Sequence, residues 1–120
     1  LPHDLRPDIV IEIQTQTTRT VHAFDAKYRR EDHKGYWIPL REDIDKMHAY
    51  RDAVGQVIQD NFQRTLKSAI VFFPAENNIP YQTHAFFKSL PHGIGGLPLL
   101  PGDSNTLNIL SNHITHHILP

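Results

Sequence analysis

Hydrophobic and polar residues alternate over two stretches near the start of the chain, residues 8–13 and residues 21–28. In the first stretch isoleucine occupies every second position, and Asp8, Val10 and Glu12 fill the positions between. Successive side chains of a β-strand point to opposite faces of a sheet, so each stretch is expected to form a strand with one largely apolar face. The polar residues between the two stretches predict a turn that joins them.

The second stretch carries charged side chains on a strand that is otherwise apolar. Alternation divides its residues between two faces, which hold Val21, Ala23, Asp25 and Lys27 on one side and His22, Phe24, Ala26 and Tyr28 on the other. If the two strands pair, Asp8, Asp25 and Lys27 come together, and buried charges then need one another, a metal ion or a ligand. The alternative is that Asp8 caps a strand while Asp25 and Lys27 form a half-exposed ion pair, which contributes only ~0–1 kcal/mol.

Residues 31–42 contain two breakers, Gly35 and Pro39, and predict a loop. Either this loop is a flap over a substrate, or Tyr36 and Trp37 hold it against the core, and the second interpretation is favoured. From Asp43 to about Asn61 the period becomes helical. The apolar side of this predicted helix consists of Ile44, Met47, Val54, Val57 and Ile58.

The continuous apolar run from Lys67 to Phe73 predicts a buried central strand, parallel to its neighbour across the helical crossover. Residues 75–80 predict a turn, and residues 81–87 an irregular connection, with an edge strand as the alternative. Residues 94–100 predict a strand at a sheet edge, because Pro98 cannot donate a ladder hydrogen bond.

A last helix is expected after residues 101–104, with Asp103 or Ser104 as its N-cap. Its apolar stripe is Leu107, Leu110, Ile114 and Ile118. The helix also carries His113, His116 and His117, of which the first and last are spaced to share a metal ion. Zinc needs at least one further ligand, so a solvated histidine face is the favoured interpretation.

Composition narrows the class of protein. The 120 residues suit a single domain. The absence of cysteine excludes disulfides, thiolate zinc sites and cysteine catalysis, and it fits a reducing cytoplasm. There is no apolar run near the ~20 residues that span a bilayer, so a membrane role is not expected.

Charge is informative through its distribution rather than its total. The net charge of −1 makes no case for nucleic acid. A basic group nevertheless follows the second strand and continues into the predicted helix, namely Arg29, Arg30, Lys34, Arg41, Lys46 and Arg51. Such a basic rim beside an acidic site suits a phosphodiester substrate, and an ordinary solvated loop is the alternative.

The two strands carry a recognisable signature. Pro7-Asp8 opens the first strand, and Asp25-Ala26-Lys27 ends the second. In this combination the chain resembles the PD-(D/E)XK nuclease superfamily, which has the restriction-endonuclease-like fold. The resemblance implies an α/β domain with a mixed β-sheet flanked by helices. The family's opening helix and strand do not fit before Asp8, so the chain is expected to be the C-terminal part of a longer nuclease domain.

The resemblance also assigns roles to residues. Asp8 and Asp25 would be metal ligands together with the backbone carbonyl of Ala26, and such oxygen ligands suit Mg²⁺ or Mn²⁺. Lys27 would orient or deprotonate the attacking water, or stabilise charge in the transition state. Glu12 lies about 13 Å along the strand from Asp8 at ~3.3 Å per residue, so it is a weaker candidate.

The predicted helix supplies a second point of resemblance. RecB-type nucleases and the nuclease subunit of McrBC-type restriction systems carry a helical Gln-x-x-x-Tyr after this strand, and here Lys46 and Tyr50 stand at that spacing. Lys46 replaces the expected glutamine, and its implied role is to contact a phosphate or to orient an acidic ligand. Tyr50 matches the tyrosine and is expected to contact nucleic acid, as are Arg29 and Arg30 of the basic rim. The alternative is a lysine that extends from the helix to solvent and a tyrosine at the core boundary.

The function implied is that of a Mg²⁺-dependent endonuclease, a hydrolase acting on DNA within a restriction or defence system together with other domains or subunits. Two alternatives stay open. One is a nuclease-fold module without catalysis that binds nucleic acid or a partner protein, and the other is a structural domain in which the charged trio is an ion-pair network.

Overall fold

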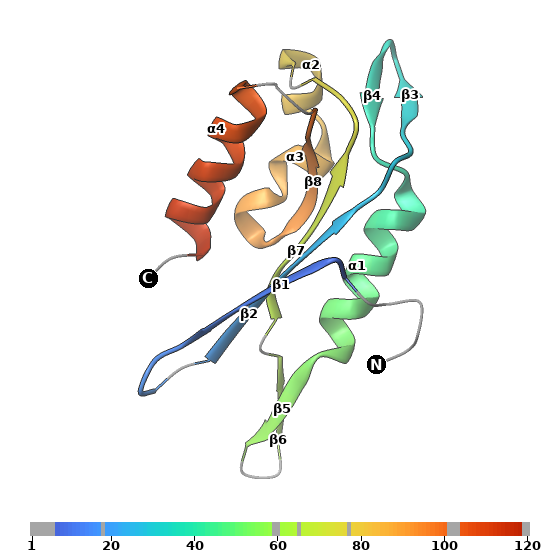
Figure 1. Cartoon of the computed structure of the whole chain (residues 1–120). Coiled ribbons are helices and arrows are strands. Elements are labelled where there is room, and N and C mark those ends of the chain that lie inside the picture. The colour runs from blue at the N-terminus through green and yellow to red at the C-terminus, as the bar shows by residue number, and fades with distance from the viewer. Residues whose placement is uncertain are drawn as a thin grey trace.

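A four-stranded mixed sheet forms the centre of the protein (Figure 1). The computed structural model describes residues 7–17, 19–58, 61–64, 66–76, 78–100 and 104–118. In sheet order the strands are β1 (Ile9–Gln14), β2 (Arg19–Ala26), β7 (Leu66–Phe73) and β8 (Ile94–Pro98). Strand β1 is antiparallel to β2, whereas β2, β7 and β8 are parallel. The predicted mixed α/β architecture is confirmed.

The first two strands form the predicted hairpin. Their register pairs Ile9 with Phe24 at one end and Gln14 with Arg19 at the other. Along β2 the side chains alternate between two apolar clusters, since Val21 and Ala23 belong to one and Phe24 to the other. Strand β2 is therefore covered on both faces, and a charged side chain on it needs a partner.

Helix α1 (Arg41–Ala53) forms the crossover from β2 to β7 and packs on the sheet through Ile44, Met47 and Tyr50. The helix was expected to continue to about Asn61, and this prediction is wrong. Val54 is already extended, with φ −97° and ψ 126°, and Gly55 begins a strand. Glycine is a weak helix former and the β-branched residues that follow favour a strand, so the helix ends early.

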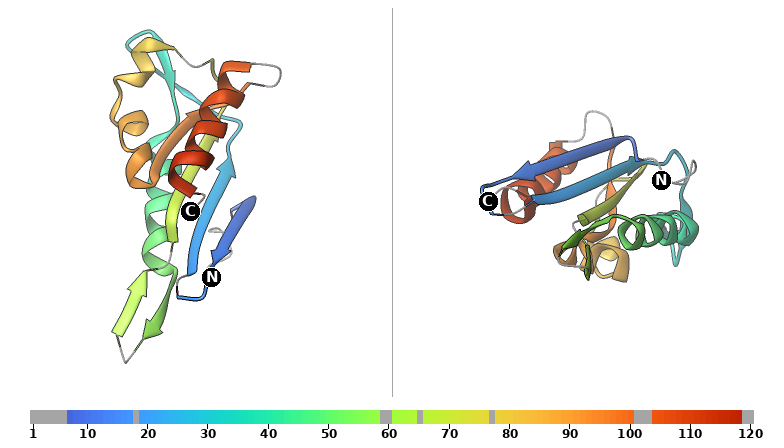
Figure 2. Two further views of the ribbon diagram at one scale, coloured as in Figure 1. Left: turned by 90° about the vertical axis from the view of Figure 1, so that its left-hand side faces the viewer. Right: turned by 90° about the horizontal axis from the view of Figure 1, so that it is seen from below.

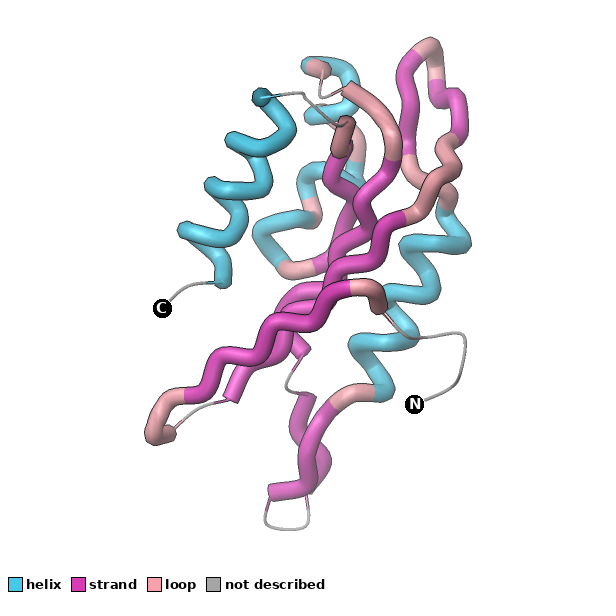
Figure 3. The backbone as a smooth tube through the Cα atoms, in the orientation of Figure 1, coloured by secondary structure: helices cyan, strands magenta, loops and turns pink. Residues whose placement is uncertain are grey.

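Strands β5 (Gly55–Ile58) and β6 (Asn61–Arg64) pair antiparallel as a separate hairpin. Val57 and Ile58, which were expected on the apolar side of the helix, lie in this hairpin instead. Figure 3 shows the hairpin extending beyond the end of α1, away from the central sheet. Strand β7 enters the sheet directly afterwards as the predicted buried, parallel strand, so that prediction is confirmed.

The predicted loop of residues 31–42 contains a short hairpin, β3 (Glu31–His33) and β4 (Tyr36–Ile38). Its two-residue turn has positive φ at Lys34 (54°) and Gly35 (91°), the geometry that matches the twist of a tight hairpin. Tyr36 packs on the core, but Trp37 is 40% exposed. Only one of the two aromatic residues therefore holds this segment as expected.

Two short helices, α2 (Ile79–Gln82) and α3 (Ala85–Lys88), and a 3₁₀ turn, η2 (Leu90–His92), replace the irregular connection expected before β8. Each helix is capped from the preceding residue. The side chain of Asn78 accepts a hydrogen bond from the Tyr81 amide, and that of His84 from the Phe86 amide. These caps explain how helices of one turn form in a stretch without helical periodicity.

The C-terminal part of the chain covers the second face of the sheet. Strand β8 lies at the sheet edge as predicted, and α4 (Ser104–His113) continues as a π-helical turn, η3 (Ile114–Ile118). Leu110 and Ile114 pack on the Phe24 side of the sheet, opposite the face covered by α1 (Figure 2). Of the two predicted N-caps, Asp103 lies outside the described residues and Ser104 is the first residue of α4. No helix in the described ranges is long and apolar enough to cross a membrane.

Candidate active site

Asp8 and Asp25 meet at the open end of the β1–β2 hairpin. The register that pairs Ile9 with Phe24 brings Asp8 opposite Asp25 when it is continued by one residue. The amide of Ala26 donates a hydrogen bond of 2.8 Å to Oδ2 of Asp8. The carboxylate of Asp8 is thereby held against the backbone of the Asp25-Ala26-Lys27 segment.

Asp25 is buried between a cation and a second carboxylate. Its side chain is 12% exposed, and its Oδ2 lies 2.9 Å from Nζ of Lys27, whose side chain is 30% exposed. Burial raises the pKa of the Asp25 carboxyl, the hydrogen bond and charge of Lys27 oppose this, and the hydrogen bond and charge of Asp8 raise it further. The structure thus brings together all three residues of the predicted trio.

The trio lies where the parallel strands end. The amide of Lys27 donates to the carbonyl of Phe72 at 2.8 Å, and the amide of Leu99 donates to Phe73 at 2.9 Å. The carboxyl ends of β2, β7 and β8 therefore share one edge. In open α/β sheets this edge is where ligands generally bind, so the position suits a reactive site.

A protein-family model for the PD-(D/E)XK nuclease superfamily matches residues 2–78. The match includes both halves of the signature, the crossover helix and β7. The chain belongs to the PD-(D/E)XK nuclease superfamily. Its members are in general nucleases, which hydrolyse phosphodiester bonds and typically use divalent metal ions. None of the curated proteins and none of the solved structures compared with the chain gives a match.

The donor set of this superfamily member fits a hard divalent cation. Asp8 and Asp25 are neighbouring carboxylates, and like charges in contact favour either a shared proton or a cation between them. In the part of the chain that the structure describes, no three His, Asp or Glu side chains gather to hold a metal ion. Mg²⁺ accommodates such a sparse site, because it binds through one or two carboxylates and completes its shell with water and substrate phosphate.

The two arginines expected to contact nucleic acid are engaged with protein groups. Arg29 donates to both carboxylate oxygens of Asp43, at 3.1 and 2.5 Å, and forms an ion pair of 2.8 Å with Glu42. The hydrogen bond to Asp43 is the main reason why the pKa of Arg29 is raised. Arg30 lies 3.9 Å above the ring of Trp37 and donates to the carbonyl of Pro74.

Arg29 consequently ties the segment after β2 to the first turn of α1. The side chain of Asp43 is fully buried, so it depends on this bidentate partner. The sequence indicated Asp43 only as the start of the predicted helix. The pairing has no local signal, since its partner lies 14 residues away on another element.

Lys46 and Tyr50 are placed differently from each other. Tyr50 is 5% exposed and packs from α1 into the core, where burial raises its pKa. This favours the packing role that was the alternative for Tyr50. Lys46 is half-buried on the same helix. Glu12 forms an ion pair of 2.8 Å with Arg19 near the turn of the hairpin, away from the trio.

Two aromatic residues at this edge are exposed, whereas the sequence favoured packing for Trp37 and a strand position for Tyr28. Tyr28, which directly follows Lys27, is 93% exposed, and Trp37 presents its ring beside Arg30. The alternation pattern placed Tyr28 on a strand face, but β2 ends at Ala26, so the side chain is released to the surface. The sequence did not indicate that the strand ends before Tyr28.

Proposed function

We propose that the chain is a Mg²⁺- or Mn²⁺-dependent nuclease that hydrolyses phosphodiester bonds in DNA, with Asp8, Asp25 and Lys27 as its catalytic residues. The observation that carries the proposal is the buried carboxylate of Asp25, which lies between the ammonium of Lys27 and the carboxylate of Asp8. The proposed setting is a restriction or defence system related to McrBC-type and RecB-type nucleases, in the cytoplasm.

In this proposal Asp8, Asp25 and the carbonyl of Ala26 hold the metal ion. These residues would hold a divalent ion that would supply a water molecule of lowered pKa and positive charge beside the phosphate. The hydrogen bond from the Ala26 amide holds the Asp8 carboxylate against the end of β2. Burial keeps the Asp25 carboxylate away from bulk water, which strengthens its interaction with cations.

Lys27 has a separate role. An ammonium group has three donors, and the contact with Asp25 uses one of them. Because the side chain is partly exposed, its remaining donors can reach a water molecule or a phosphate oxygen. Lys27 therefore orients the attacking water or stabilises the charge that develops on the phosphate.

The basic groups near this edge support a nucleic-acid substrate. Arg30 presents a guanidinium stacked on an exposed tryptophan, and Lys46 adds a positive charge on α1. Such groups attract the phosphate backbone without reading its sequence. Arg29 contributes to the same rim, although its main contacts are with Glu42 and Asp43.

Cleavage of DNA by an Asp25→Asn variant tests this function. The exchange removes the negative charge but keeps the shape of the side chain, so cleavage is expected to be abolished while stability at neutral pH is unchanged or raised. Glu12→Gln is the matched control, because the same chemical change on the same hairpin affects only an exposed ion pair with Arg19. Plasmid cleavage with Mg²⁺ or Mn²⁺ and thermal unfolding measure the two properties.

Undiminished cleavage by Asp25→Asn would contradict the assignment. A loss of about 3–5 kcal/mol in stability instead would identify the trio as a structural ion-pair network. The second candidate, a catalytically inactive module that binds nucleic acid or a partner protein, is favoured by one observation, namely that Arg29 and Arg30 already have partners within the protein. Tight DNA binding by the wild type without any cleavage would support that candidate.

A further inference from the structure

A second polar site lies on the opposite face of β2 from the trio. His22 is 2% exposed, and its Nδ1 lies 2.7 Å from Oγ of Ser68 on β7. Its Nε2 is buried and has no hydrogen-bonding partner among the described residues. A buried polar atom without a partner is costly, and the residue that carries it lines a cavity.

The hydrogen bond to Ser68 defines what Nε2 can offer. Burial lowers the pKa of His22, which keeps the ring neutral. When the hydroxyl of Ser68 donates to Nδ1, the proton of the neutral ring resides on Nε2. The unused nitrogen is then a donor, which suits an acceptor such as a phosphate oxygen.

A β-bulge shapes this site. Val21 pairs with Leu66 and His22 pairs with Ser68, so Lys67 is an extra residue between two ladder positions of parallel strands. Adjacent residues of a regular strand point to opposite faces, yet Lys67 and Ser68 both line the same cavity. Bulges between parallel strands are rare, and bulges often redirect a side chain next to a functional site.

The cavity at this site is basic. It has a volume of about 430 Å³, and the described residues that line it include His22, Lys67, His92 and His116 but no carboxylate. These histidines form no group arranged to hold a metal ion in the described part of the chain. Among these described residues Lys67 carries a formal positive charge and none carries a negative one, so the cavity favours an anion.

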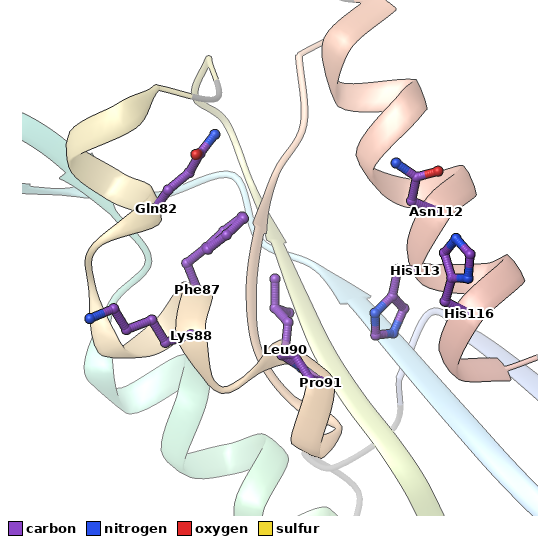
Figure 4. A pocket seen from close by; sticks show the side chains of 8 residues that line it. All are labelled: Gln82, Phe87, Lys88, Leu90, Pro91, Asn112, His113 and His116. Carbon is purple, nitrogen blue, oxygen red and sulfur yellow. The ribbon is translucent and has the colours of Figure 1, made fainter.

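A second cavity of about 390 Å³ adjoins the first and shares Pro91 and His116 with it. Figure 4 shows its two walls, with Phe87 and Leu90 on one side and α4 with Asn112 on the other. Apolar surfaces with a few amide groups suit a flat heterocycle, which stacks on its faces and forms hydrogen bonds at its edges.

We propose that the two adjoining cavities bind a nucleotide. Its phosphate lies against His22, Lys67 and His92, and its base lies between the Phe87–Leu90 wall and α4. A free nucleoside monophosphate and the terminal nucleotide of a DNA strand share this chemistry. Because Asp25 faces α1 and His22 faces α4, the nucleotide site is separate from the trio and does not depend on the nuclease reaction.

Titration calorimetry on the full chain tests the proposal, with EDTA present so that no metal contributes. The four nucleoside 5′-monophosphates are compared with the nucleosides and with inorganic phosphate. At least one monophosphate is expected to bind more tightly than both of its parts. Lys67→Ala is expected to weaken its binding roughly tenfold, as the loss of one hydrogen bond to a charged group predicts.

Arg51→Ala is the matched control, because it also removes one positive charge but lies in the last turn of α1, on the other face of the sheet. It is expected to leave binding unchanged. Lys67 is exposed, so its variant is expected to fold. An equal loss of nucleotide affinity in the two variants would show that only general charge attraction contributes, and it would contradict the proposed site.

Two further outcomes would overturn the proposal. Absence of binding by all four monophosphates removes the site, and binding of inorganic phosphate as tight as that of any monophosphate removes the base-binding half. A 5′-phosphorylated oligonucleotide distinguishes the two sources of the ligand. Tighter binding than the mononucleotide supports a strand end as the natural ligand, and weaker binding supports a free nucleotide.

Discussion

Asp25 is a buried carboxyl group with neighbours of both charges. Its pKa is raised because burial and the Asp8 carboxyl outweigh the opposing effect of the Lys27 ammonium. The proposed role of Asp25 requires the ionised carboxylate, because a protonated carboxyl group does not hold a metal ion. The surroundings of Asp25 therefore favour a cation over bulk water as its partner at neutral pH.

At the residue scale, Asp8→Asn is expected to lower the pKa of Asp25. The exchange removes the negative charge of Asp8, which makes ionisation of Asp25 less favourable in the wild type. Carboxyl-carbon NMR titration without metal measures this pKa directly. Glu12 is the internal control, because its pKa is lowered by Arg19 and should stay the same in the variant. A pKa of Asp25 that does not change would show that Asp8 lies too far away to share an ion with it.

The raised pKa also sets how stability depends on pH. The protonated form of Asp25 is favoured in the folded state, so its contribution to the free energy of unfolding is fully present below the pKa of the unfolded chain. This contribution is lost as the pH rises through the folded-state pKa. Asp25→Asn lacks the loss, which is why the variant is expected to be at least as stable as the wild type at neutral pH.

At the scale of elements, α2 is attached to the edge strand β8 by one buried hydrogen bond. The hydroxyl of Tyr81 donates to the carbonyl of Gly96 at 2.6 Å, and the side chain is fully buried. Burial is also the main reason why the pKa of Tyr81 is raised. The contact fixes the segment whose later residues form one wall of the proposed nucleotide site.

Tyr81→Phe is therefore expected to lower the free energy of unfolding by about 1–3 kcal/mol, because it leaves a buried carbonyl without this donor. Tyr28→Phe removes the same hydroxyl from a side chain that is 93% exposed and should have no measurable effect. Urea unfolding of both variants measures the difference. Equal stability of the two variants would mean that the Tyr81 hydroxyl contributes nothing to the fold.

The elements differ in how far the sequence predicts them. The strands of the central sheet follow from alternation or from continuous apolar runs, because their burial requires those patterns. The end of α1 was predicted too late, because the apolar spacing of Val57 and Ile58 fits both a helix and a strand. In the structure a strand begins at Gly55. Helices α2 and α3 were missed because each depends on a single capping side chain rather than on periodicity.

At the scale of the whole molecule, the sheet separates two sites of opposite charge preference. Acidic Asp8 and Asp25 lie at the carboxyl ends of the parallel strands, and the basic cavity around His22 lies on the α4 face. The first site was predictable because its residues belong to one hairpin, whose register follows from a short sequence. The second joins His22 to Ser68, 46 residues apart, and no local pattern connects them.

The difference between local and long-range contacts also explains why the contacts of Arg29 and Arg30 were not predicted. Arg29 was expected to contact nucleic acid because positive charges cluster after β2, but its buried partner Asp43 becomes adjacent only when α1 folds onto the sheet. Charge along a sequence thus predicted a basic rim and did not predict which of its members are engaged within the protein. Arg30 is similar, since its contacts with Trp37 and Pro74 depend on the β3–β4 hairpin and on the end of β7.

Binding of a divalent cation by Asp8 and Asp25 is the central claim, and Mn²⁺ tests it most directly. This ion is paramagnetic and accepts oxygen ligands of the same kind as Mg²⁺. At substoichiometric Mn²⁺, the amide NMR signals of Asp8, Asp25, Ala26 and Lys27 are expected to lose intensity first. The loss should disappear in Asp8→Ala and in Asp25→Ala, and it should persist in Glu12→Gln. Signal loss that survives Asp25→Ala, or that centres on another part of the chain, would contradict the assignment.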